Sequence, residues 1–459
     1  MLEYLGIGTL SLVIYIVIII SVTYFLRRPI TEAMLAAFIV LLVMATIAGH
    51  NPLLLLAEGI LFTMAQEAVF AAMAFVYMAY IMEQTQIVVR LVRILNSLLG
   101  RIAGGAGYVS TIASALFGMV SGSGTGNAST VGSITIPWME ETGWSKPRAT
   151  SIVAGNAGLG IVFPPSSSMF LLLGMPAIAA ELTSSGLYVT LMGVALIILI
   201  YRLFVVFCYV KRDKIRAVDQ ANIMPIKESL KQNWISISLF LGIIIPLLLT
   251  MGPLSNWLAA QGSFNDKGVG SISLLIWIPI LTTIICILTG RKHLPHGLKG
   301  WFDMHINVLP KYKEIGGLML VAFAASRVLV RLGLEVEIGN AFNALGQRSN
   351  LWVILTVAAL LTMMVGPFSS TATTTAVGSV AYLAFRSIGL NPALACSVFL
   401  VLVSNEGCVP PNSGPIYLAS GISGLENPAV IFKPLLLHFA IPTILMAILF
   451  ALGIIPVLS

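Results

Sequence analysis

The sequence has 459 residues, of which 58% are hydrophobic and only 9% are charged, and its mean hydropathy is +0.97. About a quarter of the residues of an average soluble protein are charged, so this composition excludes such a protein and indicates an integral membrane protein. Apolar runs of about 20 residues recur along the chain, which favours spanning helices over the strands of an outer-membrane barrel. The net charge of +7 lies largely in loops, so we predict contacts with membrane lipids and no binding of nucleic acid.

The apolar runs define the predicted spans. The first run, Ile7 to Phe25, is too long for a signal-peptide core and has no basic segment before it, so we predict a retained span. The predicted spans are residues 7–26, 30–48, 68–84, 148–175, 186–209, 234–251, 271–289, 315–333, 392–422 and 429–456, with 148–175 and 392–422 interrupted. Residues 52–66 are apolar but short, and they either lie at the interface or lengthen the third span.

Two further segments, 103–138 and 351–387, are apolar at both ends and polar in the middle. Each either enters and returns as a helical hairpin or crosses once as an irregular helix. Basic residues cluster at 27–28, 90–101, 211–216 and 291–313, whereas the loops 49–52, 176–185 and 252–270 carry only one lysine, Lys267. A hairpin at 103–138 leaves every basic cluster on one side of the membrane. The positive-inside rule therefore favours the hairpin and predicts both termini outside the cytoplasm.

The chain contains an internal repeat. Val131-Gly132-Ser133 precedes Pro164-Pro165 by 33 residues, and Val377-Gly378-Ser379 precedes Pro410-Pro411 by the same 33. The offset of 246 residues also aligns Gly143 with Gly389, Ser123 with Ser369, Thr125 with Thr371 and Ser167 with Ser413. An odd number of predicted crossings between the copies inverts the second copy relative to the first. Inverted repeats with interrupted helices at matching positions indicate a secondary transporter that binds its substrate near mid-membrane.

The residues of the repeat resemble those of a known family, the large membrane (M) subunits of TRAP (tripartite ATP-independent periplasmic) transporters. The resemblance runs from about Phe75 to Leu172, through RLVRILNSLLGRIAGGAGYVSTIASALFGMVSGSGTGNASTVGS and IVFPPSSSM. It resumes from about Leu361 to Ile422 with GPFSSTATTT and VPPNSGPIYLASGI. The resemblance implies an all-α, inverted-repeat, elevator-type transporter with two re-entrant helical hairpins and two interrupted transmembrane helices.

The resemblance also implies a function and partners. It implies sodium-driven import of a small organic acid, a carboxylate or sulfonate, across the inner membrane of a bacterium or archaeon. A periplasmic binding protein would deliver the substrate, and a separate small four-span membrane subunit would complete the system. The sequence departs from the usual pattern of the family in three places, which bear on its subfamily and substrate. They are the region GSFNDKGVGSISLL, Glu406 within NEGCVPPN, and residues 176–314, which match no family motif.

The two polar breaks carry the oxygen atoms that a sodium ion needs. Hydroxyls, amide oxygens and backbone carbonyls freed by interrupted helices are suitable ligands, and glycines let the backbone approach closely. Candidate ligands of a first sodium site are Ser121, Ser123, Thr125, Asn127, Asn156, Gly158 and Gly160. Those of a second site are Ser369, Ser370, Thr371, Thr373, Asn405 and Gly407. The predicted substrate site between them consists of Pro164, Pro165, Ser166, Ser167, Pro410, Pro411, Asn412 and Ser413.

The alternative interpretation is that these small polar residues only pack helices together, as is common in membrane bundles. Two matched clusters, each followed by a Pro-Pro break at equal spacing, favour binding. Arg327 lies deep in a predicted span, where we favour a structural ion pair or snorkelling. Glu406 lies in a break, where it attracts sodium, selects a cationic group of the substrate, or forms a structural salt bridge. We interpret Glu58, Glu67 and Glu83 as boundary residues.

We divide the chain accordingly. The predicted units are N-terminal scaffold spans (1–102), the first hairpin and broken helix (103–185), central scaffold spans with basic loops (186–350), the second hairpin and broken helix (351–423), and a C-terminal span (424–459). No nucleophile–base pair or metal-ligand motif indicates an enzyme. The alternatives are a stand-alone elevator-type carrier, coupled to sodium or protons without a binding protein, and a passive channel.

Overall fold

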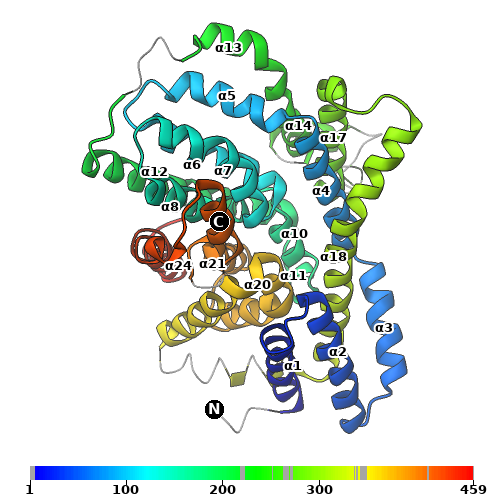
Figure 1. Cartoon of the computed structure of the whole chain (residues 1–459). Coiled ribbons are helices and arrows are strands. Elements are labelled where there is room, and N and C mark those ends of the chain that lie inside the picture. The colour runs from blue at the N-terminus through cyan, green and yellow to red at the C-terminus, as the bar shows by residue number, and fades with distance from the viewer. Residues whose placement is uncertain are drawn as a thin grey trace.

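The computed structural model describes residues 6–217, 223–250, 252–261, 268, 272–334, 336–337, 340–341, 349–410 and 413–457. All regular elements in this part of the chain are helices, which confirms the predicted all-α fold (Figure 1). Within the described residues, six helical segments are long and apolar enough to span a membrane, namely Ile30–Ile47, Lys146–Leu173, Ser184–Arg212, Ile226–Thr250, Leu274–His293 and Pro428–Ala451.

The N-terminal helices follow the predicted spans. Helices α1 (Ile7–Tyr24) and α2 (Ile30–Ile47) coincide with the first two. Helix α3 (Pro52–Met64) begins where the Asn51 side chain accepts hydrogen bonds from the first-turn N–H groups at 3.0 and 3.2 Å. It meets α4 (Glu67–Gln84) at a bend of 49°. Residues 52–66, which the sequence left open, therefore contain a separate helix that joins the third predicted span at a bend.

The first polar segment is a helical hairpin. Helix α5 (Ile87–Leu99) leads into α6 (Gly105–Ser121) and α7 (Gly124–Glu141), and α6 and α7 pack against each other. The Thr135 hydroxyl donates to the Ser110 hydroxyl at 3.0 Å. A continuous helix would hold these residues about 37 Å apart, given its rise of about 1.5 Å per residue. The single irregular crossing is therefore excluded.

The second polar segment is also a hairpin. Helix α20 (Asn350–Ser387) is interrupted at Ser369, whose φ of 66° and ψ of 165° are not helical. The side chain of Asn350 donates to the carbonyl oxygen of Ile388 at 3.4 Å. These residues would lie about 57 Å apart at the two ends of a straight helix. The chain therefore reverses at Ser369.

Each hairpin is followed by a broken helix, as predicted. The first broken helix consists of α8 (Lys146–Asn156), α9 (Leu159–Val162) and α10 (Ser167–Leu173), followed by α11 (Pro176–Ala179). The second consists of α21 (Pro392–Val403), the short η5 (Ser404–Gly407) and α22 (Gly414–Ser423). Both interruptions end at prolines, which lack the N–H that would continue a helix.

The repeat found in the sequence extends to the backbone. Gly143 and Gly389, aligned by the offset, both end a hairpin with a left-handed conformation, at φ values of 93° and 87°. Each donates its N–H to the carbonyl three residues earlier, at 3.1 and 3.0 Å. Such a left-handed position favours glycine. The following helices begin at Lys146 and Pro392, which are related by the same offset.

The two copies interlock reciprocally. The first half of each broken helix packs on its own hairpin, α8 on α7 and α21 on α20. The second half crosses to the other hairpin, so that α10 packs on α20 and α22 packs on α7. This exchange relates the copies by approximate two-fold symmetry. It also brings the two breaks and the two hairpin turns to one place.

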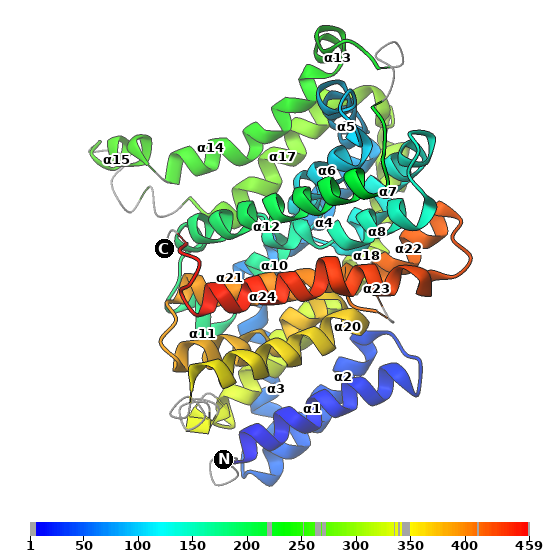
Figure 2. The same cartoon turned by 90° about the vertical axis from the view of Figure 1, so that its left-hand side faces the viewer.

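The remaining helices surround this core. They are α12 (Ser184–Arg212), α13 (Ile226–Asn233), η3 (Trp234–Phe240), α14 (Leu241–Thr250), α15 (Pro253–Ala259), α17 (Leu274–Gly290), η4 (Arg291–His293), α18 (Leu298–Arg331), η6 (Pro428–Ile431), α23 (Phe432–Leu435), η7 (Leu436–Ala440) and α24 (Ile441–Ala451). Helices α12 and α24 pack on α21, whereas α18 packs on α2, α3 and α4 and α17 packs on α4. Figure 2 shows the start of α1 and the end of α24 on one side of the molecule and the turn between α1 and α2 on the other.

The start of α1 is capped by a distant carboxylate. Glu337 accepts hydrogen bonds from the N–H groups of Gly6, Gly8 and Thr9 at 3.0, 3.1 and 2.7 Å, and from the Thr9 hydroxyl at 2.7 Å. Partial burial raises the pKa of Glu337, but these four donors outweigh it and hold the pKa below its usual value. The carboxylate thus ties α1 to the segment after α18.

The Glu337 cap predicts a pH-dependent contribution to stability. Because the folded pKa is depressed, the contribution is present above the carboxyl pKa of the unfolded chain, about 4.3, and is lost as the pH falls through the folded value. We expect Glu337→Gln to destabilise the protein by about 1 kcal/mol at pH 7, the usual cost of a lost cap, and by less at pH 4. Thermal unfolding at both pH values measures this difference. Glu426→Gln, on an exposed side chain, is the control, and an equal loss at both pH values would contradict the cap.

Candidate functional site

The two hairpin turns place matched serines at the start of the return helix, which is α7 in the first hairpin and residues 370–387 of α20 in the second. In the first turn, Gly122 is left-handed with a φ of 61°, and the Ser123 hydroxyl caps α7 by accepting from Gly126 N–H at 3.1 Å. In the second turn, Ser369 itself is left-handed, with a φ of 66°. Each return helix therefore begins at a left-handed turn that carries one of the matched serines.

The two breaks cross in direct backbone contact. A Cβ atom on Gly158 would lie 1.7 Å from the carbonyl oxygen of Ser404, in the second break. A Cβ atom on Gly407 would lie 2.0 Å from the carbonyl oxygen of Ala154, at the end of α8. Any larger residue at either glycine would overlap the opposite backbone. The predicted ligand positions Gly158 and Gly407 thus allow the two broken helices to touch.

A cavity of about 440 Å³ opens between the hairpin turns and the surrounding helices. Its polar wall comes from both turns, from α7, from the start of α10 and from the second break, and includes Ser123, Thr125, Thr130, Ser167, Ser369, Ser370, Thr371 and Glu406. Its opposite wall is largely apolar, with Phe75 and Val76 of α4 and Ile315 and Leu318 of α18. Glu83 and Lys311 also line it, 3.6 Å apart. An apolar cavity with a few convergent polar groups is the usual form of a small-molecule site.

Glu406 joins the two hairpin turns. Its carboxyl group accepts from the Ser370 N–H at 3.2 Å and the Ser370 hydroxyl at 2.6 Å, at the second turn. At the first turn it accepts from the Thr125 hydroxyl at 3.5 Å and from the N–H of Gly124. The side chain is only 2% exposed. In the described part of the chain it has no salt-bridge partner, so its neighbours are neutral donors and two helix N-termini.

Four predicted ligands carry buried oxygen atoms without a hydrogen-bond partner. Asn127 and Asn156 use their NH₂ groups as donors at 2.8 to 2.9 Å, but the Oδ1 atoms of both have no partner among the described residues. The same is true of Thr373 Oγ1 and Asn405 Oδ1. An unpaired buried acceptor costs about 1–3 kcal/mol. An asparagine Oδ1 can only accept, so a donor or a cation would satisfy it.

These four oxygen atoms are arranged in pairs. Each repeat supplies one from its return helix, Asn127 or Thr373, and one from the break of its broken helix, Asn156 or Asn405. Asn127 and Thr373 are related by the offset of 246 residues, whereas Asn156 and Asn405 are 249 residues apart. Other unpartnered buried oxygens occur elsewhere, such as Ser11 Oγ in α1. The paired arrangement fits two cation sites of the predicted composition.

The other predicted residues divide into two groups. Ser166 caps α10 by accepting from Met169 N–H at 3.2 Å, Ser413 donates to the Glu406 carbonyl, and Ser167 donates to the Gly122 carbonyl at 3.2 Å. Of these three, only Ser167 lines the cavity. Pro164, Pro165 and Pro410 lie in the breaks, and Gly160 lies in α9 against the backbone of Gly118; none of them lines the cavity. Pro411 and Asn412 lie outside the described residues, as does the side chain of Ser121.

Two of the charged residues singled out in the predicted spans, Arg327 and Glu58, contact other side chains of the scaffold. The Arg327 guanidinium stacks over the Phe62 ring at 5.6 Å. Glu58 forms a salt bridge with Arg331 at 3.0 Å. Neither arginine lines the cavity. These contacts agree with structural roles.

Sequence reasoning missed Arg202, which is 1% exposed in the middle of α12. It donates to Thr443 Oγ1 at 2.9 Å and stacks over the Phe439 ring at 4.9 Å, while its Nε and NH1 atoms have no partner among the described residues. It also contacts Cys408 Sγ at 3.8 Å, next to the second break. A lone arginine inside an apolar span was the available signal.

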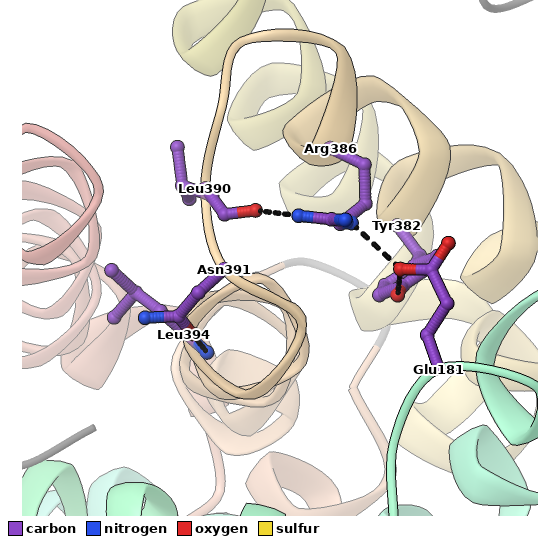
Figure 3. A network of polar contacts seen from close by, with 6 residues as sticks. All are labelled: Glu181, Tyr382, Arg386, Leu390, Asn391 and Leu394. Atoms are coloured by element: carbon purple, nitrogen blue, oxygen red, sulfur yellow. Dashed lines mark hydrogen bonds and ion pairs between the residues drawn. The ribbon is translucent and has the colours of Figure 1, made fainter.

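A polar network at the base of the second hairpin lies apart from the cavity. In Figure 3, Glu181, from the loop after α11, accepts from the Tyr382 hydroxyl at 2.8 Å and from Arg386 Nε at 2.9 Å. Asn391 caps α21 by accepting from Leu394 N–H at 2.7 Å. These contacts hold the base of the hairpin against the end of the first repeat.

The whole chain can be compared with known proteins. A family model described as "Tripartite ATP-independent periplasmic transporter, DctM component" matches residues 16–454. The chain belongs to this family. The matched range includes residues 176–314, for which the short motifs had shown no relation. As a TRAP large permease, the chain is a multi-pass membrane protein of the inner membrane, and its family works with a small membrane subunit and a periplasmic binding protein.

Two relatives are named for different substrates. The chain is 21% identical over 353 residues to the C4-dicarboxylate TRAP transporter large permease DctM of Pseudomonas aeruginosa, with 74% of each protein covered. It is 27% identical over 143 residues to the ectoine TRAP transporter large permease TeaC of Halomonas elongata, covering 31% of this chain and 32% of that protein. Family membership therefore leaves the substrate of this TRAP permease open.

The fold is similar to that of a solved transporter. The YdaH transporter of Alcanivorax borkumensis superposes with a TM-score of 0.65 at 15% sequence identity, covering 87% of both chains. At this identity the likeness concerns the fold alone. The helices of this TRAP permease, including its two hairpins and two broken helices, are thus arranged similarly to those of the YdaH transporter.

Proposed function

We propose that this chain is the permease subunit of a TRAP system that imports a small organic acid together with sodium. The observation that carries the proposal is the set of four unpartnered buried oxygens, two from each repeat, together with a cavity lined by both hairpin turns. Family membership supports the transport of a substrate, and the oxygen chemistry supports a hard cation. A separate binding protein would supply the substrate, and a separate small subunit would complete the complex.

The proposed sodium sites follow the repeat. Asn127 and Asn156 would bind the first ion, and Thr373 and Asn405 the second, together with backbone carbonyls freed at the breaks. Both return helices present their N–H groups to the cavity, where they hold Glu406. Because the proposed ion ligands and the cavity wall belong to the same hairpins and broken helices, binding of sodium and of substrate would favour each other.

We infer the orientation from charge. With the basic clusters in the cytoplasm, both termini lie in the periplasm and the base of the first hairpin faces the cytoplasm. Glu83 and Lys311 line the cavity, and their side chains are 56% and 53% exposed. They belong to the end of α4 before the basic segment 90–101 and to the basic segment 291–313. The cavity would therefore open to the cytoplasm, as in a state that releases substrate.

Replacing Thr373 with valine tests the second sodium site. The side chains have nearly the same shape, and Thr373 Oγ1 makes no hydrogen bond to the described chain, so the substitution removes only a proposed ligand. We expect the sodium concentration that half-saturates thermal stabilisation of the purified chain to rise at least tenfold, a loss of about 1.4 kcal/mol. Stability in potassium should not fall, because an unpaired buried hydroxyl has been removed.

Thr374→Val is the matched control. Thr374 is equally buried on the same return helix, but its hydroxyl donates to the Ser370 carbonyl at 2.7 Å. This variant should lose some stability in both salts while keeping the wild-type sodium dependence. Equal sodium dependence in Thr373→Val and wild type would contradict the proposed site.

A further inference from the structure

The position of Glu406 bears on the chemistry of the substrate. The N-termini of two helices, α7 and the return half of α20, meet at the polar wall of the cavity. Helix N-termini attract anions, because their N–H groups are unpaired and the helix dipole is positive there. In this chain both N-termini are already engaged by one internal carboxyl group, that of Glu406.

Residues of both hairpin turns lie in close contact with the Glu406 carboxyl group. A Cβ atom on Gly124 would lie 3.0 Å from Glu406 Cδ, so a larger residue there would have to push the carboxyl group slightly away from the first turn. Ser370 supplies both its N–H and its hydroxyl to the same oxygen, Oε2, at 3.2 and 2.6 Å. An acid group of a substrate would find these donors occupied. It would also face the Glu406 carboxyl group.

The remaining charges of the cavity lie on its other side. Among the residues that line it, the charged ones are Glu406 on the hairpin wall and Glu83 and Lys311 on the scaffold wall. Glu83 and Lys311 are 3.6 Å apart and more than half exposed, so their mutual attraction is weak. Lys311 is therefore available to an acid group, whereas Glu406 offers an acceptor to a cationic group.

We propose that the substrate is a zwitterionic organic acid, whose cationic group faces Glu406 and whose acid group faces Lys311. This inference rests on the proposed transport function and refines its substrate class. A C4-dicarboxylate, with an acid group at each end, would place one of them against Glu406. The like-charge contact would exclude it, while an ammonium or amidinium group would gain a charge-assisted hydrogen bond.

The test compares three probes on the purified full chain in saturating sodium. Thermal stabilisation is measured against the concentration of ectoine, which carries an amidinium and a carboxylate, and of succinate and isethionate, which carry only acid charges. We expect wild type to respond to ectoine at a concentration at least tenfold lower than to either anion. In Glu406→Gln, the ectoine concentration that gives half of the maximal thermal stabilisation should rise at least tenfold. The corresponding succinate concentration should fall.

Two further variants make the result specific. Glu426→Gln removes the same charge from an exposed side chain that does not line the cavity and should leave the preference for ectoine intact, which excludes a general effect of net charge. Glu406→Asp keeps the charge and should retain the preference, which separates charge from folding. A wild type that responds equally to succinate, or not at all to ectoine, overturns the inference, and so does an unchanged preference in Glu406→Gln. Thermal stabilisation of the chain by sodium, measured without any of the three probes, tests the proposed transport function separately from the substrate class.

Discussion

Replacing Gly158 with alanine is expected to prevent the chain from reaching its folded state. The new Cβ atom would lie 1.7 Å from the carbonyl oxygen of Ser404, which belongs to backbone and cannot rotate away as a side chain could. Relieving the overlap would separate the two broken helices at their crossing. Overpacking in a core typically costs about 1–3 kcal/mol, and we expect more here because two backbones must move. The measurement is the yield of monodisperse protein after membrane extraction.

Gly421→Ala is the control for this prediction. Gly421 lies in α22, and a Cβ atom there would meet nothing within 4 Å. Alanine in an open helical position stabilises by about 1 kcal/mol relative to glycine, so this variant should express at least as well as wild type. If Gly158→Ala also gave wild-type yield and thermal stability, the direct crossing of the breaks would be wrong.

Filling the cavity from both hairpin turns is expected to abolish uptake while leaving the protein in the membrane. Ser123 and Ser369 line the cavity at matched positions of the repeat. Replacing both with phenylalanine would fill the space between the turns and the apolar wall of α4 and α18. We expect sodium-dependent uptake, measured with the whole transport system in proteoliposomes, to fall at least a hundredfold, with membrane insertion unchanged.

Two controls separate filling from the loss of the hydroxyl groups. The double alanine variant removes the hydroxyls without filling the cavity, and it should cost about 1 kcal/mol at the Ser123 cap while leaving measurable uptake. Ser129→Phe places the same bulk on an exposed position of α7 and should transport normally. Normal sodium-dependent uptake by the double phenylalanine variant would rule out a substrate path through this cavity.

The predicted elements were confirmed where local signals were strong. The matched prolines, glycines and small polar runs predicted the interruptions at 148–175 and 392–422 and the symmetry that relates them. Gly143 and Gly389 show why this worked, because a left-handed helix end requires nearly the same residue in both copies. The hairpin at 103–138 depended on a different signal, the distribution of loop charge.

The candidate site was predicted in part. Ser123, Thr125, Ser167, Ser369, Ser370 and Thr371 do line one cavity, and the sequence pattern had singled them out. Ser166 and Ser413 make local hydrogen bonds instead and do not line it. The pattern could not separate these groups, because which face of a short helix a side chain occupies depends on how that helix is packed. The role of each oxygen in binding sodium stays a prediction.

The sequence by itself determined that this is an all-helical membrane transporter with a duplicated, interrupted core, because hydropathy, proline breaks and repeat spacing are local or periodic properties. Only the tertiary structure decided that the breaks cross through Gly158 and Gly407, and that Glu406 joins both hairpin turns. Thr125 and Glu406 are 281 residues apart, and no periodicity relates positions at such a separation. Their contact exists because each broken helix crosses to the other copy's hairpin.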